Sequence, residues 1–234
     1  RGLRRGAGSH LSGALASPRG PSGVFGGTFN PVHYGHLRSA LELVEHLQLE
    51  QLRLMPCAVP PHREAPACDA RHRAAMVELA VAGESRLVCD ARELQRTGPS
   101  YTIDSLLALR GELGAEHSLC LIMGCDAVLS INSWHRWQEL LHCAHIVVIA
   151  RPGWLLPEQG EVARWLQQHR LNNPQMLRER PAGGILIESM RPLPISSTEI
   201  RSMLGQGRSA RYLLPEAVLD YIEQHKLYER DCAV

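Results

Sequence analysis

The sequence predicts an α/β fold: a doubly wound, mostly parallel sheet flanked by helices, with a C-terminal helical end. Two observations predict it. Short apolar runs alternate with amphipathic helical stretches from Gly23 onward, as in repeated strand-helix-strand units whose sheet is covered on both faces. The chain has 234 residues and 44% hydrophobic content, enough for one sizeable domain with a real core.

Six strands are predicted from the apolar runs. They are Ser22–Gly26, Gln51–Pro56, Arg86–Asp90, Ser118–Gly124, His145–Ala150 and Gly184–Glu188. The first has the weakest pattern, because "PRGPSGVFGG" brings two prolines and only two strongly apolar residues, Val24 and Phe25. We therefore expect this strand to begin late.

Seven helices are predicted between and after these strands. They are Gly35–Leu47, Ala70–Ala82, Thr102–Leu113, Arg136–Leu141, Gly160–Gln168, Ser197–Leu204 and Pro215–Gln224. The first has the clearest pattern, because apolar residues in "HLRSALELVEHL" recur at spacings of three and four. One α/β domain over residues 23–234, with a helical C-terminal end, accounts for all of the predicted strands and helices.

The first 22 residues are set apart by composition. They are rich in Arg, Gly and Ser, contain no acidic residue and do not start with Met. We expect a disordered or non-native N-terminal extension, with a transit-like presequence as the alternative.

The charge pattern limits the partners. The formal net charge is +1, but residues 1–22 hold four of the 25 basic residues and none of the 24 acidic ones, so the body is slightly acidic. This argues against general nucleic-acid binding, which needs a basic field. Lys226 is the only lysine. A Schiff-base lysine and a P-loop lysine are therefore unlikely, and phosphate recognition must rely on Arg, His and backbone N–H groups.

Cysteine and hydropathy patterns indicate the compartment. The seven cysteines form no CxxC pair, and several lie in apolar runs such as "SLCLIMGC". We expect reduced thiols, a cytoplasmic location and no membrane association, because no apolar run approaches the roughly 18 to 20 residues that span a bilayer.

The segment "GVFGGTFNPVHYGHLR" predicts an anion site. A strand that ends in Gly26 and Gly27 and leads into a helix places backbone N–H groups and the positive helix end at the carboxyl edge of the sheet. The glycines allow close approach of a phosphate to the main chain. His33 and His36 lie three apart, so both imidazoles face one volume, and Gly35 keeps that volume uncrowded.

Three other roles for the two histidines compete with phosphate binding. A metal site lacks a third and a fourth ligand at a familiar spacing, so no metal ligand is assigned. A structural role would have one histidine cap a helix and the other pack in the core. Dinucleotide binding through GxGxxG fails because the glycines stand at 23, 26 and 27. Phosphate binding by paired histidines is favoured.

A second motif, "PISSTEIR" (Pro194 to Arg201), predicts another helix N-terminus suited to anions. Ser196 and Glu199 have the spacing of a capping box, so a helix starts at Ser197 with free N–H groups and carries Arg201 one turn in. An ordinary capped helix with a surface arginine is the alternative when this motif is taken alone.

The string "GGTFNPVHYGH" resembles the (H/T)xGH signature of the nucleotidyltransferase superfamily, and with its GGTF start it resembles the bacterial nicotinate-nucleotide (nicotinic acid mononucleotide) adenylyltransferases. "PISSTEIR" resembles their ISSTxxR element, and further likenesses extend over nearly all of residues 23–228. The resemblance implies a Rossmann-like fold. It also implies transfer of AMP from ATP to nicotinate mononucleotide, giving deamido-NAD and pyrophosphate in NAD biosynthesis, with Mg²⁺ bound through the ATP phosphates.

The same resemblance implies a set of site residues. The catalytic residues are His33, His36 and Arg201; the ATP-binding residues are Gly26, Gly27, Thr28, Phe29, Ser196, Ser197 and Asp126; the mononucleotide-binding residues are His62, Arg63, Tyr101, Thr102 and Trp134. Two positions depart from the common pattern. Asn30 replaces a frequent Asp, and Cys125 puts a smaller side chain in a turn expected to face the substrate.

The sequence is also compatible with other functions. A phosphopantetheine adenylyltransferase or a cytidylyltransferase would share the histidine loop but is not expected to carry "GPSYT" and "SWHRW" together. An adenylyltransferase of the same superfamily that acts on nicotinamide mononucleotide stays open as an alternative. A nucleotide-binding regulator without turnover is the alternative from another class, and the absence of GxGxxG weighs against an oxidoreductase. A homo-oligomer is left open.

Overall fold

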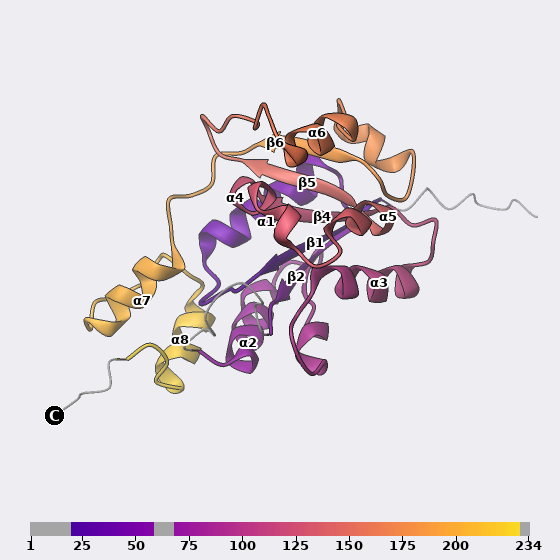
Figure 1. Cartoon of the computed structure of the whole chain (residues 1–234). Coiled ribbons are helices and arrows are strands. Elements are labelled where there is room, and N and C mark those ends of the chain that lie inside the picture. Colours follow the sequence, from indigo (N-terminus) through magenta and orange to yellow (C-terminus); the bar gives the residue numbers. More distant parts are fainter. Residues whose placement is uncertain (1–19, 59–67, 230–234) are drawn as a thin grey trace, which may run out of the picture.

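The computed structural model describes residues 20–58 and 68–229. Its described strands form one parallel sheet in the order β3-β2-β1-β4-β5-β6 (Figure 1). The strands are β1 (Ser22–Gly27), β2 (Gln51–Pro56), β3 (Leu87–Cys89), β4 (Leu119–Gly124), β5 (His145–Ala150) and β6 (Ile185–Ser189). This strand order is the doubly wound, Rossmann-like one, so the predicted fold class is confirmed.

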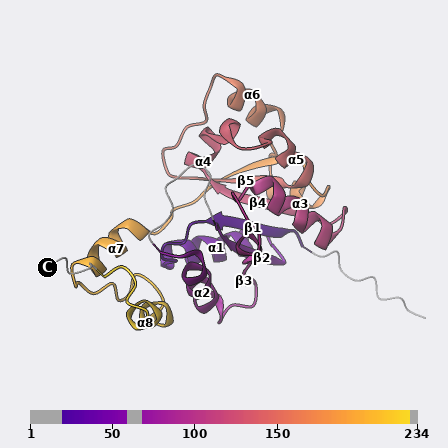
Figure 2. The same ribbon diagram turned by 60° about the horizontal axis from the view of Figure 1, so that its bottom comes forward.

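The helices cover both faces of the sheet (Figure 2). They are α1 (Tyr34–His46), α2 (Ala70–Val81), α3 (Thr102–Leu113), α4 (Cys125–Leu129), α5 (Leu140–Cys143), α6 (Glu161–Gln168), α7 (Ser197–Gly205) and α8 (Glu216–Gln224). Short 3₁₀ helices are η1 (Arg92–Gln95), η2 (Ile131–Ser133), η3 (Trp137–Glu139) and η4 (Pro174–Arg178). The predicted C-terminal helical end consists of α7 and α8.

The core has two halves, one on each face of the sheet. Residues of α1, α2, α7 and α8 form one buried cluster, and residues of α3 to α6 form the other. Side chains of a strand alternate between the two: in β2, Leu54 belongs to the first cluster and the next residue, Met55, to the second. This is why the inner strands look continuously apolar in the sequence.

The first strand does not begin late, because glycine makes room where apolar side chains are few. Strand β1 starts at Ser22 and pairs with both β2 and β4 at the centre of the sheet. A Cβ at Gly23 would lie 2.5 Å from Cδ1 of Leu52 and 2.9 Å from Cδ1 of Leu49. The leucines of neighbouring elements fill this part of the core instead. Whether the domain is divided from an extension at residue 22 stays a prediction, although Ser22 itself belongs to β1.

One predicted helix, Arg136–Leu141, is wrong. Arg136 has a left-handed backbone (φ 52°), which ends any regular helix, and the chain continues through η3 into the one-turn helix α5. Helix α4, directly after β4, was not predicted from the sequence. Five residues are too few to show a helical period.

The topology places a ligand crevice between β1 and β4. The chain proceeds from β1 to β2 and β3 on one side, then returns to β4 on the other, so the connections diverge at the carboxyl ends of these two strands. These ends are Gly27 and Gly124. Within the described residues, no helix combines the length and apolar character that a bilayer span requires.

Candidate functional site

The two sequence motifs meet at the carboxyl edge of the sheet. The Ser197 hydroxyl, at the start of α7, donates to the Pro31 carbonyl at 2.9 Å, and Arg201 Nη1 donates to the Asn30 carbonyl at 2.7 Å. Tyr228 adds a third contact, because its hydroxyl donates to Asn30 Oδ1 at 2.6 Å. Segments more than 160 residues apart in the sequence therefore share one turn after β1.

His33 and His36 together form a capping box at the N-terminus of helix α1. His33 is the N-cap residue, and its Nδ1 accepts the Gly35 N–H at 3.1 Å. Nδ1 of His36 accepts the backbone N–H of His33 at 3.3 Å, and the two rings stack with centroids 3.8 Å apart. An Nδ1 that accepts a hydrogen bond carries no proton, so each neutral ring holds its proton on Nε2. Nε2 of neither ring has a partner among the described residues.

Burial keeps both imidazoles neutral. Desolvation lowers the pKa of His33 to about 4; desolvation and then the charge of His33 lower the pKa of His36 to about 3. The His36 and Phe29 rings pack in a T-shaped arrangement with centroids 5.1 Å apart, and this contact contributes to the desolvation of His36. The site therefore offers two adjacent N–H donors without a fixed positive charge. The capping role and a ligand role are both open to these histidines, because they use opposite ring nitrogens.

The free energy of unfolding is expected to fall as the pH drops below about 6.5. In that range the unfolded imidazoles take up protons, whereas the folded ones, with pKa values of about 4 and about 3, do not. Stability rises with pH by up to about 1.4 kcal/mol per pH unit for each histidine and levels off above pH 6.5. Urea titrations between pH 4.5 and 7.5 measure this slope. A double His33→Asn/His36→Asn variant should reduce this slope, while the buried His145, whose pKa desolvation also lowers, keeps part of it. An unchanged slope would contradict the assignment.

The three glycines near the histidines have different surroundings. A Cβ on Gly26 would meet nothing within 4 Å, so this position does leave open space beside the main chain. A Cβ on Gly27, however, would lie 2.9 Å from Phe29 Cζ, and one on Gly35 would lie 2.9 Å from the His33 ring. These two glycines let a neighbouring aromatic ring pack against the backbone.

The side chains of Phe29 and Cys125 are buried, and the expected orientation of Cys125 toward the substrate is wrong. Phe29 is only 2% exposed and belongs to the core below α1 and α2, so it offers a ligand its backbone at most. Its left-handed conformation (φ 46°) turns the chain back toward the histidines. Cys125 is also 2% exposed and packs in the opposite core as the first residue of α4, so its thiol does not face a substrate.

Helix α7 presents its N-terminus beside the histidine loop. Ser196 is the N-cap, and its hydroxyl accepts the Glu199 N–H at 3.1 Å, which is one half of the predicted capping box. Arg201 Nη1 is engaged by Asn30, while Arg201 Nη2 lies 3.4 Å from Thr198 Oγ1. The free N–H groups of the first turn and part of this guanidinium remain for an anion.

The remaining predicted residues that the structure describes lie at the start of α3 and in the segment that follows β4. Tyr101 is the N-cap of α3 and Thr102 its first residue, while the Tyr101 ring lies 4.4 Å from the His135 ring. Trp134 is half-buried directly after η2, and Asp126 is exposed in the first turn of α4, where it pairs with Arg151 at 3.3 Å. His62 and Arg63 lie outside the described residues.

Sequence reasoning missed Arg73, which is 1% exposed and lies on α2. Its guanidinium donates to the carbonyls of Thr28 at 2.7 Å, Cys57 at 2.7 Å and Cys68 at 3.2 Å. Arg73 thereby joins the loop after β1, the end of β2 and the segment before α2. A signal was present: in "ARHRAAMVELA" this arginine stands three and four residues before Met76 and Val77, on the apolar face.

No group of three or more His, Cys, Asp or Glu in residues 20–58 and 68–229 is arranged to hold a metal ion. The arrangement instead suits an anionic chain. Neutral imidazole N–H donors, a helix N-terminus and a guanidinium converge from two motifs, as recognition of several phosphate oxygens requires.

Comparison with known proteins agrees with this geometry. The family model described as cytidylyltransferase-like matches residues 24–203. A relative from Cellvibrio japonicus named "Probable nicotinate-nucleotide adenylyltransferase" is 50% identical over 206 residues, covering 88% of this chain and 97% of that protein. A relative of the same name from Aeromonas salmonicida is 46% identical over 213 residues, covering 91% and 99%.

A solved structure shows the same fold. The nicotinic acid mononucleotide adenylyltransferase of Plasmodium falciparum, complexed with NaAD, superposes with a TM-score of 0.65 at 18% identity and covers 90% of this chain and 98% of that one. The sequence relatives and the family model together span the histidine loop and the α7 motif. The chain therefore belongs to the cytidylyltransferase-like family, among the nicotinate-nucleotide adenylyltransferases.

Proposed function

We propose that this protein transfers the AMP group of ATP to nicotinate mononucleotide, giving deamido-NAD and pyrophosphate, the activity for which its relatives are named. One structural observation supports this most directly: His33, His36 and the N-terminus of α7 lie together at the crevice between β1 and β4. Such a site holds a polyphosphate chain at the sheet position where doubly wound folds bind nucleotides.

The reaction requires the protein to position the two substrates rather than to supply a nucleophile or a general base. An oxygen of the acceptor 5′-phosphate attacks the α-phosphorus of ATP in line, the bond from that phosphorus to the β-phosphate bridge breaks, and pyrophosphate leaves. No protein nucleophile is required, and the acceptor phosphate is already ionised at neutral pH. Catalysis consists of aligning two anions that repel each other and stabilising the charge that builds on the phosphates.

The two motifs divide this work. His33 and His36 donate from Nε2 to the α- and β-phosphates, with Gly26, Gly27, Thr28 and the Phe29 backbone beside them. Arg201 and the N–H groups near Ser196 and Ser197 receive the β- and γ-phosphates. Because Arg201 Nη1 is held by the Asn30 carbonyl, its guanidinium is oriented before the nucleotide arrives. Neutral imidazoles suit this role, since their donors need no proton uptake first.

Mg²⁺ fits the site as a companion of ATP. The residues that surround the histidines supply donors rather than carboxylates, so we propose that phosphate oxygens and water hold the ion. Bound in this way, it would neutralise part of the phosphate charge. A cytoplasmic setting agrees with the six described cysteines, all of which are free thiols.

The acceptor end of the site is assigned to Tyr101, Thr102 and Trp134, with His62 and Arg63 toward its phosphate and Asp126 at a nucleotide ribose. Trp134 is half-buried, and its indole suits stacking on an electron-poor pyridine ring. The Thr102 hydroxyl and the first N–H groups of α3 are hydrogen-bond donors. A carboxylate can accept from them, whereas an amide would present its own N–H₂ group to these donors.

Nicotinate mononucleotide is accordingly expected to react with a higher kcat/KM than nicotinamide mononucleotide. A coupled pyrophosphate assay with ATP, Mg²⁺ and a small panel of acceptors measures this directly. The panel includes phosphopantetheine as a structurally unrelated acceptor. Equal efficiency with the acid and the amide would refute the acceptor assignment, and absence of pyrophosphate with every acceptor would refute the enzymatic function itself.

A further inference from the structure

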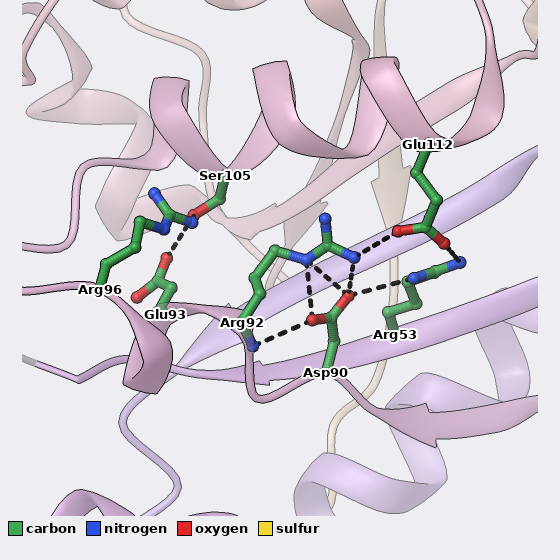
Figure 3. A network of polar contacts seen from close by, with 7 residues as sticks. All are labelled: Arg53, Asp90, Arg92, Glu93, Arg96, Ser105 and Glu112. Carbon is green, nitrogen blue, oxygen red and sulfur yellow. Dashed lines mark hydrogen bonds and ion pairs between the residues drawn. The ribbon is translucent and has the colours of Figure 1, made fainter.

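Two polar networks surround η1, the short 3₁₀ helix after β3 (Figure 3). In the first, Asp90 and Glu112 bind the guanidinium groups of Arg53 and Arg92. In the second, Ser105 on α3 lies between Glu93 and Arg96. We define this second group, Glu93, Ser105 and Arg96, as the serine relay. It is not used by the phosphate chemistry proposed above.

The serine relay is a buried chain of charge-assisted hydrogen bonds. The Ser105 hydroxyl donates to Glu93 Oε1 at 2.8 Å and accepts from Arg96 Nη2 at 2.7 Å. Glu93 is 8% exposed and Ser105 is 3% exposed. A single hydroxyl thus connects a carboxylate with a guanidinium, and it must act as donor and acceptor at once. No apolar side chain of similar size can replace it.

The serine relay links the two ends of the segment between η1 and α3. Residues 97–101 leave η1 at Arg96 and enter the helix at Thr102, and the Arg96–Ser105 hydrogen bond ties the two ends together. The N-cap Tyr101 makes no side-chain capping bond, so the usual device for fixing a helix start is absent there. Within the first turn, the Ser105 N–H also donates to the Tyr101 carbonyl, at 3.4 Å.

A further contact joins this segment to the edge of the sheet. The Cys57 thiol, directly after β2, interacts with the side chains of Glu93 and Ser100. Burial, followed by the charge of Glu93, raises the pKa of this thiol to about 11, so the thiol keeps its proton beside the carboxylate. Glu93 is therefore held from both sides, by Cys57 of the sheet edge and by Ser105 of α3.

We propose that Glu93, Ser105 and Arg96 are positioning residues for acceptor recognition, which hold Tyr101 and Thr102 where the mononucleotide binds. The proposal rests on the function proposed above and adds the group that sets its acceptor affinity. Among the described residues, no hydrogen bond or ion pair joins Glu93, Ser105 or Arg96 directly to the two histidines or to α7. Its loss should therefore affect the two substrates differently, which a general loss of folding would not do.

The test is a kinetic comparison of Ser105→Ala with the wild-type chain, varying each substrate in turn. We expect the KM for nicotinate mononucleotide to rise about tenfold, because the acceptor contacts are no longer held in place, and the KM for ATP to stay within about twofold. Arg96→Ala is a second test variant, and because Arg96 is only half-buried its loss is less disruptive to folding than the loss of a fully buried residue. It should raise the acceptor KM in the same direction even if Ser105→Ala fails to fold.

Two matched variants serve as controls. Ser105→Thr keeps the hydroxyl and should restore the acceptor KM to within about threefold of wild type. Glu112→Ala, two turns further along α3, removes the carboxylate that binds Arg53 and Arg92 in the neighbouring network. It loses a comparable number of charged hydrogen bonds but should leave both KM values unchanged.

The outcomes separate the inference from the function on which it depends. An unchanged acceptor KM in both Ser105→Ala and Arg96→Ala would overturn the relay, and so would parallel increases in both substrate KM values. Wild-type chain that releases no pyrophosphate with nicotinate mononucleotide would instead overturn the proposed function. An acceptor-specific defect that Ser105→Thr corrects and Glu112→Ala does not reproduce is the expected result.

Discussion

Replacement of His36 by alanine is expected to lower kcat by about two to four orders of magnitude. The His36 ring is neutral at pH 7, and its Nε2–H has no partner among the described residues, so it is available to the phosphates as charge builds on them. In the variant this donor is absent, and water takes its place beside the phosphates. Water is not held in a fixed orientation, so it must reorganise during each turnover. Steady-state kinetics at saturating ATP and nicotinate mononucleotide measure the effect.

A second substitution at this position separates catalysis from helix capping. His36→Ala also removes the acceptor for the His33 backbone N–H, which by itself costs about 1 kcal/mol of stability. His36→Asn keeps an acceptor near the place of Nδ1 but has no donor near Nε2. It should unfold like wild type at neutral pH and remain slow. Wild-type turnover in either variant would show that His36 takes no part in catalysis.

The fold was predictable to the extent that its strands bury both faces. The apolar runs of β4 and β5 indicate buried parallel strands, and the structure confirms both to within a residue or two. The pattern was least informative where packing depends on small or unusual residues. Strand β1 lies at the centre of the sheet although it contributes few large side chains, because Leu52 fills the space left by Gly23. The left-handed Arg136 carries no local signal in the sequence.

The site was predictable as a meeting of two motifs but not in its supporting contacts. Two features of the sequence each indicate anion binding: the pair of histidines that follows a strand ending in glycine, and the capped N-terminus of a later helix. The hydrogen bonds at Asn30 and Pro31 bring these two segments together. The sequence cannot show which glycine faces a ligand and which faces a ring, since this depends on where the Phe29 ring packs. Long-range hydrogen bonds to backbone carbonyls, such as those of Arg73, also produce no periodic pattern in the sequence from which they could be predicted.

Replacement of Arg73 by leucine is expected to lower the free energy of unfolding by about 3 to 5 kcal/mol. The guanidinium is almost fully buried, and its donors satisfy carbonyls of three separate segments: Thr28 after β1, Cys57 after β2 and Cys68 before α2. Leucine fills much of the volume but leaves those carbonyls without donors. Each buried polar group left unpaired costs about 1 to 3 kcal/mol, and relaxation recovers part of the sum.

Urea unfolding of three variants tests this role of Arg73. Arg71→Ala changes an exposed arginine on the same helix and should alter stability by about 0.5 kcal/mol or less. Arg73→Lys keeps the charge, but a single ammonium cannot reach carbonyls that Nε, Nη1 and Nη2 contact separately, so an intermediate loss is expected. If Arg73→Leu were as stable as Arg71→Ala, the carbonyls would have to find other donors, and the loop after β1 would not depend on α2 for its position.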